Sequence, residues 1–326
     1  MTKSASRFGI SNSASMVATP AAKQRFSGAT ALVMLAALYG TMGVFARYLG
    51  NGLGLFEQWY LRLGIGVLIS WLLFYRQLDL RKFLHLPRRE WVIILARSTL
   101  TYAAAIPLFT VANQLAKIGP VSFMQAVPTM AIFGVLIFGE KLTPKKAALI
   151  LLSFIGVVVV AVPNLQEILN FNVGELISLL SGALFSLSIL ARRWHSPILN
   201  NYEIAFVTVA AGAVINYALA LLSSHRAIIP AGHWSASFAG VLLIAAFLSA
   251  LMNYLLNYGM EQVKPILAGN IFSLEEVFGP ISGLIAYKEL LTLRELVGGA
   301  IILIPVLLMN QLQRQTPKAP RTAPLV

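Results

Sequence analysis

The sequence contains no cysteine among its 326 residues, so a disulfide framework, a thiolate metal site and a cysteine nucleophile are excluded. Charged residues are also scarce, at 11%, and the only aspartate is Asp79. The histidines (His85, His195, His225 and His233) are scattered over expected loops and helix ends, and no GxxxxGKS or GxxxxGKT motif for ATP phosphates occurs. These absences argue against an enzyme and against ATP-driven transport, and they imply no cofactor.

Apolar residues are abundant instead: 58% of the chain is hydrophobic and the mean hydropathy is +0.76. Apolar runs of about 20 residues recur from about residue 28 to about residue 311, and about 20 residues of helix cross a bilayer core. We therefore expect an all-α integral membrane protein with ten transmembrane helices. Their centres should lie at about residues 38, 65, 100, 128, 154, 181, 212, 248, 276 and 302.

The net charge of +13 would suggest nucleic-acid binding in a soluble chain. If both termini are cytoplasmic, however, about 18 of the 25 Lys and Arg residues fall on the inner side of the membrane. The positive-inside rule then explains the charge as a topology signal. We expect a multi-pass protein of the inner membrane, in contact with the lipid bilayer and not with nucleic acid.

The two ends of the chain differ from the apolar runs. Residues 1–27 are rich in Ser and Ala, with no acid among the first 26, and residues 312–326 are polar and proline-rich. The N-terminal composition resembles that of an organelle transit peptide, but a clear apolar periodicity is missing. Disordered cytoplasmic tails are the favoured interpretation of both segments.

A weak internal similarity divides the apolar region into two units, residues 28–165 and 170–311. The segment FGVLIFGEKLTPKK (133–146) aligns with SGLIAYKELLTLRE (282–295), so that Glu140 matches Glu289. Because each unit would contain five spans, an odd number, the second would enter the membrane from the opposite side. The sequence thus predicts two inverted five-helix repeats, an arrangement common in secondary transporters.

Three stretches carry a resemblance to a known family: LFEQWYLRLGIGVLI, the run from LAKIGP to GVVVV, and the run from ALMNYLL to GGAIIL. They resemble the drug/metabolite transporter superfamily, EamA-like branch, from about residue 28 to about residue 311. The resemblance implies ten helices and cytoplasmic termini. It also implies a central cavity lined by spans one, three, four, six, eight and nine, and transport of small organic metabolites, often export.

The stretch FSLEEVFGP (272–280) places two acids within an otherwise apolar segment. Where the family reads Leu-Glu-Pro, this chain reads Leu274, Glu275, Glu276, so Glu275 matches the family and Glu276 replaces its proline. Carboxylates at mid-membrane depth are costly and often functional. Since neighbouring helical residues point about 100° apart, we expect one carboxyl in the cavity and one toward a neighbouring helix.

At least one of the two glutamates is expected to bind a proton or a cationic substrate group. The structural alternative is a neutral buried acid, or a pair with Arg62 or Arg97. For Arg62, an ion pair with Glu57 is the preferred explanation.

Two prolines predict hinges near the midplane. Pro128 in the fourth span and Pro280 in the ninth lack the N–H that would bond the carbonyl four residues earlier. The freed carbonyls would belong to Met124 and Glu276, and carbonyls of interrupted helices can coordinate cations.

Further polar residues are expected to bind substrate or protons: Gln125, Asn270, Asn253, Asn257, Tyr102 and Arg97. Tyr254 and Tyr258, next to the two asparagines of span eight, would lie on the cytoplasmic side of the cavity. For Gln125, Asn253 and Asn257, hydrogen bonds between helices explain the pattern equally well. Glu140 and Glu289 are expected to be structural.

The predicted function is secondary transport of a small organic metabolite, such as an amino acid, an amine or a nucleoside-type compound, by alternating access. Coupling to protons and exchange both remain open, export is the expected direction, and the chain is a monomer or a homodimer. An acidic cavity favours cationic or zwitterionic substrates over sugar phosphates. The alternative is a membrane channel or receptor for a small metabolite.

Overall fold

The computed structural model describes residues 27–115, 121, 124–125, 127–161, 173–224, 235–288 and 290–315. Over these residues the regular structure is entirely helical. The helices are α1 (Gly28–Leu49), α2 (Leu55–Phe74), α3 (Leu80–Leu84), α4 (Arg88–Thr99), the π-helical η1 (Leu100–Ala105), α5 (Ile106–Leu115), α7 (Thr129–Phe138), α8 (Pro144–Ala161), α10 (Val173–Leu190), the 3₁₀ turn η2 (Ala191–Trp194), α11 (Asn201–Ser224), α12 (Ala236–Gln262), α13 (Pro265–Phe272), α14 (Glu275–Tyr287) and α15 (Leu293–Gln315).

Five stretches are long and apolar enough to cross a membrane: Gly28–Ala46, Arg88–Ala112, Val173–Trp194, Asn201–Ser223 and Ala236–Gln262. Large apolar side chains such as Leu136, Leu222 and Ile285 are about three-quarters exposed on the outside of the bundle. In lipid such surfaces are solvated, since the bilayer is as apolar as leucine. The structure thus confirms an all-helical, multi-pass membrane protein, and the count of ten spans stays a prediction.

Local sequence signals explain several helix ends. Ser27 begins α1 and Ser235 begins α12, and each hydroxyl accepts a hydrogen bond from the backbone N–H three residues later. Pro265 starts α13, where a missing N–H costs nothing.

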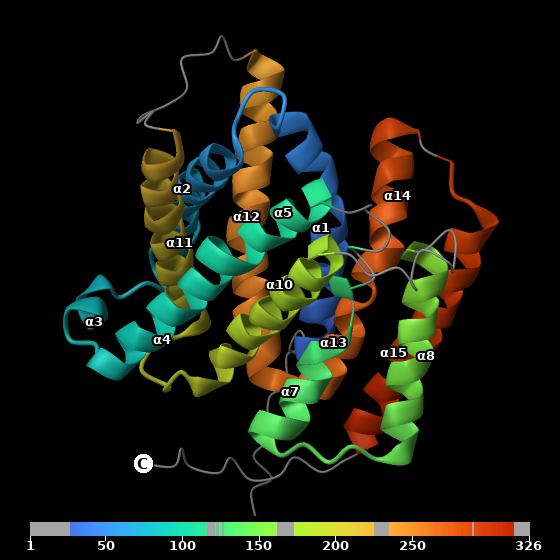
Figure 1. Ribbon diagram of the computed structural model, residues 1–326. Helices are drawn as coiled ribbons and strands as arrows, with labels where there is room; N and C mark the ends of the chain where they lie inside the picture. The colour runs from blue at the N-terminus through green and yellow to red at the C-terminus, as the bar shows by residue number, and fades with distance from the viewer. Residues whose placement is uncertain are drawn as a thin grey trace, which may run out of the picture.

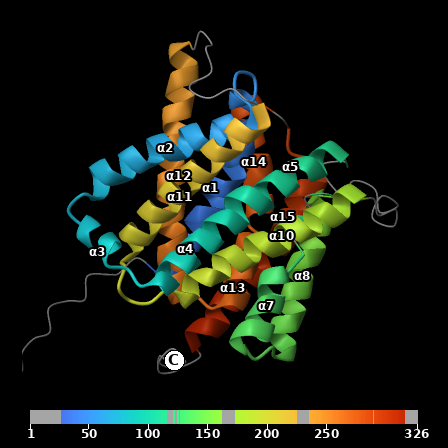
Figure 2. The ribbon, with the colours of Figure 1, turned by 60° about the vertical axis from the view of Figure 1, so that its left-hand side comes forward.

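The helices pack as pairs that Figures 1 and 2 both show. α8 lies along α15, α2 lies against α11 and α12, and α1 packs between α12 and α14. The stretch α4–η1–α5 runs beside α10, and the short helices α7 and α13 contact each other. Elements far apart in sequence therefore meet throughout the bundle.

Small residues allow the closest of these contacts. A Cβ added at Gly40 of α1 would lie 2.8 Å from the backbone nitrogen of Gly279 in α14. A Cβ at Gly156 of α8 would lie 2.9 Å from the backbone nitrogen of Ile302 in α15. Glycine is required at both crossings because the backbones themselves are in contact.

The two units predicted from the internal similarity share a local geometry. α7 ends at Gly139 (φ 61°, ψ 29°) and α14 ends at Lys288 (φ 58°, ψ 28°), both left-handed, and these positions correspond in the alignment of Glu140 with Glu289. The Gly139 N–H donates to the carbonyls of residues 134 and 135, and the Lys288 N–H to those of residues 283 and 284. The same helix cap thus occurs at equivalent places in both halves.

The predicted tails lie largely outside the described residues, as does Glu289. At the C-terminal end α15 runs to Gln315, so the helix includes the first four positions of the segment expected to be disordered. The tail boundary at residue 312 stays a prediction.

Candidate functional site

Side chains from both halves of the chain surround a cavity of about 350 Å³, within the range of small-molecule pockets. The expected site residues on its wall are Glu275, Glu276, Gln125, Asn270, Asn253, Tyr102, Arg97 and Pro128. Asn257 and Pro280 are not on the wall. The lining also includes Trp59 of α2, Ser153 of α8 and Thr208 of α11, so more helices contribute than the family resemblance implied.

Two helix interruptions border this cavity. The first precedes α7, where Pro128 takes the N-cap position, and the second separates α13 from α14 at Ser273 and Leu274. The chain therefore bends before Pro280, which lies inside α14. The Met124 carbonyl is not freed as expected, because it accepts a hydrogen bond from the Val127 N–H at 3.4 Å.

Glu275 and Glu276 form the first turn of α14, and both line the cavity. The expectation that only one would face it was wrong, because both residues directly after the interruption lie on the wall. Among the described residues, neither carboxyl has a hydrogen-bond or ion-pair partner, and neither Arg62 nor Arg97 pairs with them. The N-terminal end of a helix favours negative charge, which partly offsets the cost of placing carboxylates there.

A polar pair faces the cavity between α8 and α13. The Ser153 hydroxyl donates to Asn270 Oδ1 at 2.6 Å, a length typical of an O–H···O bond and too short for an amide donor. The Asn270 amide nitrogen is buried and has no partner. Elsewhere on the wall, Gln125 Oε1 lies 3.5 Å from the Ser178 hydroxyl of α10, a long contact.

Tyr102 lies in η1, and a π-helical turn inside a longer helix is common at functional sites. Its hydroxyl is 3.5 Å from the amide nitrogen of Asn253, which also donates to the Ser249 carbonyl at 2.9 Å. The Trp59 ring lies 6.0 Å from the Tyr102 ring, centroid to centroid. This part of the wall combines aromatic surface with a few polar groups.

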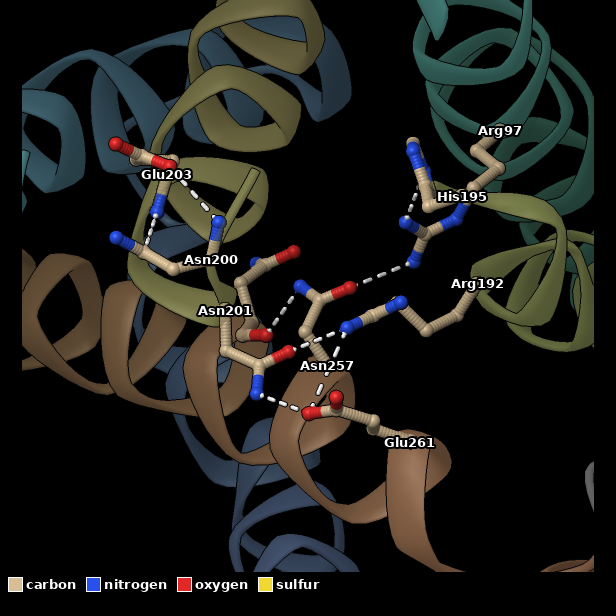
Figure 3. Close-up of polar contacts among 9 residues, drawn as sticks. Arg97, Arg192, His195, Asn200, Asn201, Glu203, Asn257 and Glu261 are labelled. Atoms are coloured by element: carbon tan, nitrogen blue, oxygen red, sulfur yellow. Dashed lines mark hydrogen bonds and ion pairs between the residues drawn. The ribbon is translucent and has the colours of Figure 1, made fainter. Parts of the chain in front are cut away.

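Arg97 is buried and its guanidinium contacts three residues of the second half of the chain, as Figure 3 partly shows. Nε donates to the Ser188 carbonyl at 3.1 Å, Nη2 donates to Asn257 Oδ1 at 3.1 Å, and Nη1 lies 3.0 Å from His195 Nε2. Asn257 is fully buried and its amide nitrogen donates to the Asn253 carbonyl. Asn257 is therefore part of a contact between helices and not of the cavity wall.

Other expectations need correction. Glu57 does not pair with Arg62, because its carboxylate caps α2 by accepting from the Gly54 N–H. Arg62 instead donates to Ser249 Oγ at 3.2 Å and lies over the Trp59 ring at 4.6 Å. Tyr254 is absent from the cavity wall because it stacks on Tyr202 at 4.6 Å.

Several wall residues were missed by sequence reasoning. Tyr39 of α1 lies on the wall with its ring 6.2 Å from that of Phe185 and 6.1 Å from that of Phe272. Trp59 and Ser153 were missed as well. These residues stand in ordinary apolar helices, and no local motif separates them from packing residues.

Glu140 has a structural position, as expected. Its Oε2 accepts from the backbone N–H of Ile266 in α13 at 3.2 Å, and its Oε1 lies 3.7 Å from Arg193 Nη1. Burial raises the pKa of the Glu140 carboxyl above its usual value. No cluster of three or more His, Cys, Asp or Glu that could hold a metal ion occurs in the part of the chain that the structure describes.

Membrane-length helices around a partly polar cavity define a multi-pass membrane protein of the transporter class. The model of the EamA-like transporter family matches residues 26–162 and again residues 172–311. The chain therefore belongs to the EamA-like transporter family, and the resemblance to the drug/metabolite transporter superfamily is confirmed. A small-molecule substrate and a membrane environment follow from this membership, which also points away from an enzyme.

Two similar proteins agree with this assignment. A protein of Archaeoglobus fulgidus described as an uncharacterized transporter is 27% identical over 287 residues, which cover 86% of this chain and 95% of the relative. A solved crystal structure superimposes with a TM-score of 0.72 at 18% identity, covering 88% of this chain and 98% of that one. At this identity the second similarity supports the fold alone.

Proposed function

We propose that this protein is a secondary transporter that moves a small cationic or zwitterionic metabolite, such as an amino acid, an amine or a nucleoside-type compound, by alternating access. The observation that carries the proposal is the pair Glu275 and Glu276, on the cavity wall and without a protein partner among the described residues. Unpaired carboxylates in a membrane protein cost free energy unless a proton or a cation meets them. Binding of a substrate cation or of protons would supply that partner.

The rest of the wall favours a cation over an anion. Arg97 already uses Nε, Nη1 and Nη2 in contacts with Ser188, His195 and Asn257. Arg62 is 1% exposed and does not line the cavity. Sugar phosphates, which are recognised by accessible arginine and lysine, fit this cavity poorly.

Alternating access is supported by the two interrupted helices and their matched caps. Interrupted helices at equivalent places of inverted repeats provide binding sites and points of bending in many secondary transporters. The proposed units are residues 28–165 and 170–311, with cytoplasmic tails on either side, in the inner membrane. Pro128 would act as a hinge in the first unit, whereas in the second the bend would occur at Ser273 and Leu274. Export is the proposed direction, and the proposed driving reaction is proton coupling or exchange.

The proposal predicts that Glu275→Gln and Glu276→Gln each reduce uptake of the transported amine or amino acid into proteoliposomes by about tenfold or more. Loss of a hydrogen bond to a charged group costs about 1.5–3 kcal/mol, which corresponds to that range. Uptake of radiolabelled amino acids, amines and nucleosides should be measured from pH 5 to 8.

Glu57→Gln is the matched control, because Glu57 caps α2 outside the cavity and a glutamine can still accept the Gly54 N–H. It should transport like the parent. Parental uptake by both cavity variants across the whole pH range would refute the assignment of the carboxyl pair.

A further inference from the structure

A group of four residues joins the two halves of the chain at one end of the cavity. We call it the Arg97 clasp: Glu90 and Arg97 of α4, His195 directly after η2, and Asn257 of α12. Arg97 lies on the cavity wall, while the other three lie behind it. Figure 3 shows the Arg97 guanidinium between His195 and Asn257, with both contacts drawn.

The hydrogen bonds of the clasp define the state of His195. Its Nδ1 lies 2.8 Å from Glu90 Oε2, which can only accept, so Nδ1 carries the proton. Its Nε2 lies 3.0 Å from Arg97 Nη1, which can only donate, so Nε2 must be unprotonated. The clasp in this geometry therefore requires a neutral imidazole.

Charged groups surround His195 on several elements. Glu90 and Arg97 approach it from α4, Arg192 belongs to η2 itself, and Arg192 lies 3.9 Å from Glu261 of α12. Arg192 also donates to Asn201 at the start of α11, at 2.6 Å. Next to Arg192, Arg193 faces away toward Glu140 at 3.7 Å.

Burial, together with the Arg97 cation, lowers the pKa of His195 to about 4, although the neighbouring Glu90 acts in the opposite direction. The contact between His195 and Glu90 is thus a hydrogen bond from a neutral ring and not an ion pair at neutral pH. If the clasp opened, water would reach the ring, which would keep Glu90 and lose its closest cation, so both causes of the lowered pKa would weaken and the pKa would rise toward about 6.5.

The position of the clasp suits a gate. Glu90 lies in the first turn of α4, Arg97 in its last turn, and Asn257 near the end of α12. The positive-inside rule predicts that the start of α4 and the end of α12 are cytoplasmic. Glu90 Oε1 also accepts from the Ser196 N–H at 2.8 Å, so the loop after η2 is held by the same group. Loss of the Arg97 contacts would break the bond between α4 and Asn257 of α12, while Glu90 would still hold the loop after η2.

Resting on the proposed transport function, we infer that the Arg97 clasp closes the cavity at this end, and that His195 takes up a proton from solvent when the clasp opens. Proton uptake on Nε2 removes the acceptor of the Arg97 bond and places two cations face to face. The closed clasp binds fewer protons than the open one, so lowering the pH favours the open state. Glu90 and His195 are therefore positioning residues for Arg97.

Because the chain has no cysteine, two introduced cysteines can carry spin labels at known places. Arg89→Cys at the start of α4 and Gln262→Cys at the end of α12 are exposed positions on either side of the clasp. Pulsed EPR in lipid nanodiscs, without substrate, measures the distance between them. The ratio of long to short distances should rise about tenfold between pH 7.5 and 5.5, as expected for a pKa of about 4 in the closed and 6.5 in the open state.

His195→Gln replaces the ring by a neutral amide that can still bond Glu90 or Arg97, and it should change the ratio less than twofold over this pH range. Asn257→Ala should raise the ratio of long to short distances already at pH 7.5, and the ratio should still rise as the pH is lowered. Ser282→Ala removes a contact between α14 and α1 elsewhere, from Ser282 Oγ to the Gly40 carbonyl, and should behave like the parent.

A pH-independent distance in the parent chain, or an unchanged pH response in His195→Gln, would overturn the clasp. Because the EPR measurement needs no substrate, its result is separate from that of the transport assay. A pH-dependent opening without any uptake would reject the transport function and leave the clasp, whereas uptake with a fixed distance would reject the clasp alone.

Discussion

At the scale of single residues, the cavity wall contains buried polar groups that satisfy one another only in part. Ser153 donates to Asn270 Oδ1, and the Asn270 amide nitrogen remains without a partner. An unmet buried donor costs about 1–3 kcal/mol, so this site stores unfavourable free energy next to the cavity. An acceptor atom of a bound substrate, after a small shift of Asn270, would recover it.

Ser153→Ala is predicted to lower the free energy of unfolding by about 1 kcal/mol, because it leaves both ends of the Asn270 amide unmet. The apparent melting temperature in detergent measures the effect. Ser235→Ala, which removes an exposed cap at the start of α12, is a useful comparison of similar expected size but away from the cavity. An amino acid, amine or nucleoside that the protein transports should raise the melting temperature of Ser235→Ala more than that of Ser153→Ala. Equal shifts would contradict a role of the Ser153 and Asn270 pair in binding.

The residues predicted from sequence differ in kind from those that were missed. Glu275 and Glu276 were found because a carboxyl in an apolar run is rare and needs a reason. The partners of Arg97 were not found, since Ser188, His195 and Asn257 lie 91, 98 and 160 positions away in the chain. Only the packing of α4 against α10 and η2, and the reach of the Arg97 side chain to α12, bring them together.

At the scale of the helix, the hinge prediction shows the same limit. Pro128 lies at an interruption as its missing N–H suggests, but the second interruption occurs at Ser273 and Leu274, before Pro280. A proline within a helix can be accommodated by a small distortion, and tertiary contacts decide where the chain bends. The sequence could therefore indicate that both helices are weakened, and not where.

The crossing of α1 and α14 gives a prediction with a built-in control. Gly40→Ala should destabilise the protein and reduce transport, since its Cβ would meet the backbone of Phe278 and Gly279 at 2.8–2.9 Å. Overpacking of this kind costs about 1–3 kcal/mol of stability. Transport should fall as well, because Gly40 directly follows Tyr39, which lies on the cavity wall. Melting temperature and uptake should both be measured.

Gly43→Ala, one turn later on the same helix, meets nothing within 4 Å and should be neutral or slightly stabilising. If both alanine variants melted at the parental temperature, the close approach of α1 and α14 would be refuted.

At the scale of the whole molecule, the arrangement of charge predicts an orientation. The turn between α1 and α2 should lie outside the cell, and the start of α4 should lie inside. In this chain without cysteine, Asn51→Cys should react with a membrane-impermeant maleimide in intact cells, whereas Arg89→Cys should react only after the membrane is opened. The reverse labelling pattern would invert the predicted topology.

The family could be predicted from sequence because the apolar runs and the stretches that resemble the family extend over most of the chain. The division into two inverted units stays a prediction, which rests on the repeated segments around Glu140 and Glu289. The cavity could be predicted from sequence only in part. Trp59 of α2, Ser153 of α8 and Thr208 of α11 reach its wall through helix packing, which has no signature in a single sequence.

Counterflow in proteoliposomes tests the central claim most directly. Liposomes loaded with an unlabelled transported amine or amino acid and diluted into the labelled compound should accumulate label transiently above equilibrium, because an alternating-access carrier exchanges one substrate for another. The variant carrying both Glu275→Gln and Glu276→Gln should lose this overshoot. A parent protein whose flux shows no overshoot and rises in proportion to concentration would instead be a channel, and would contradict alternating access through this cavity.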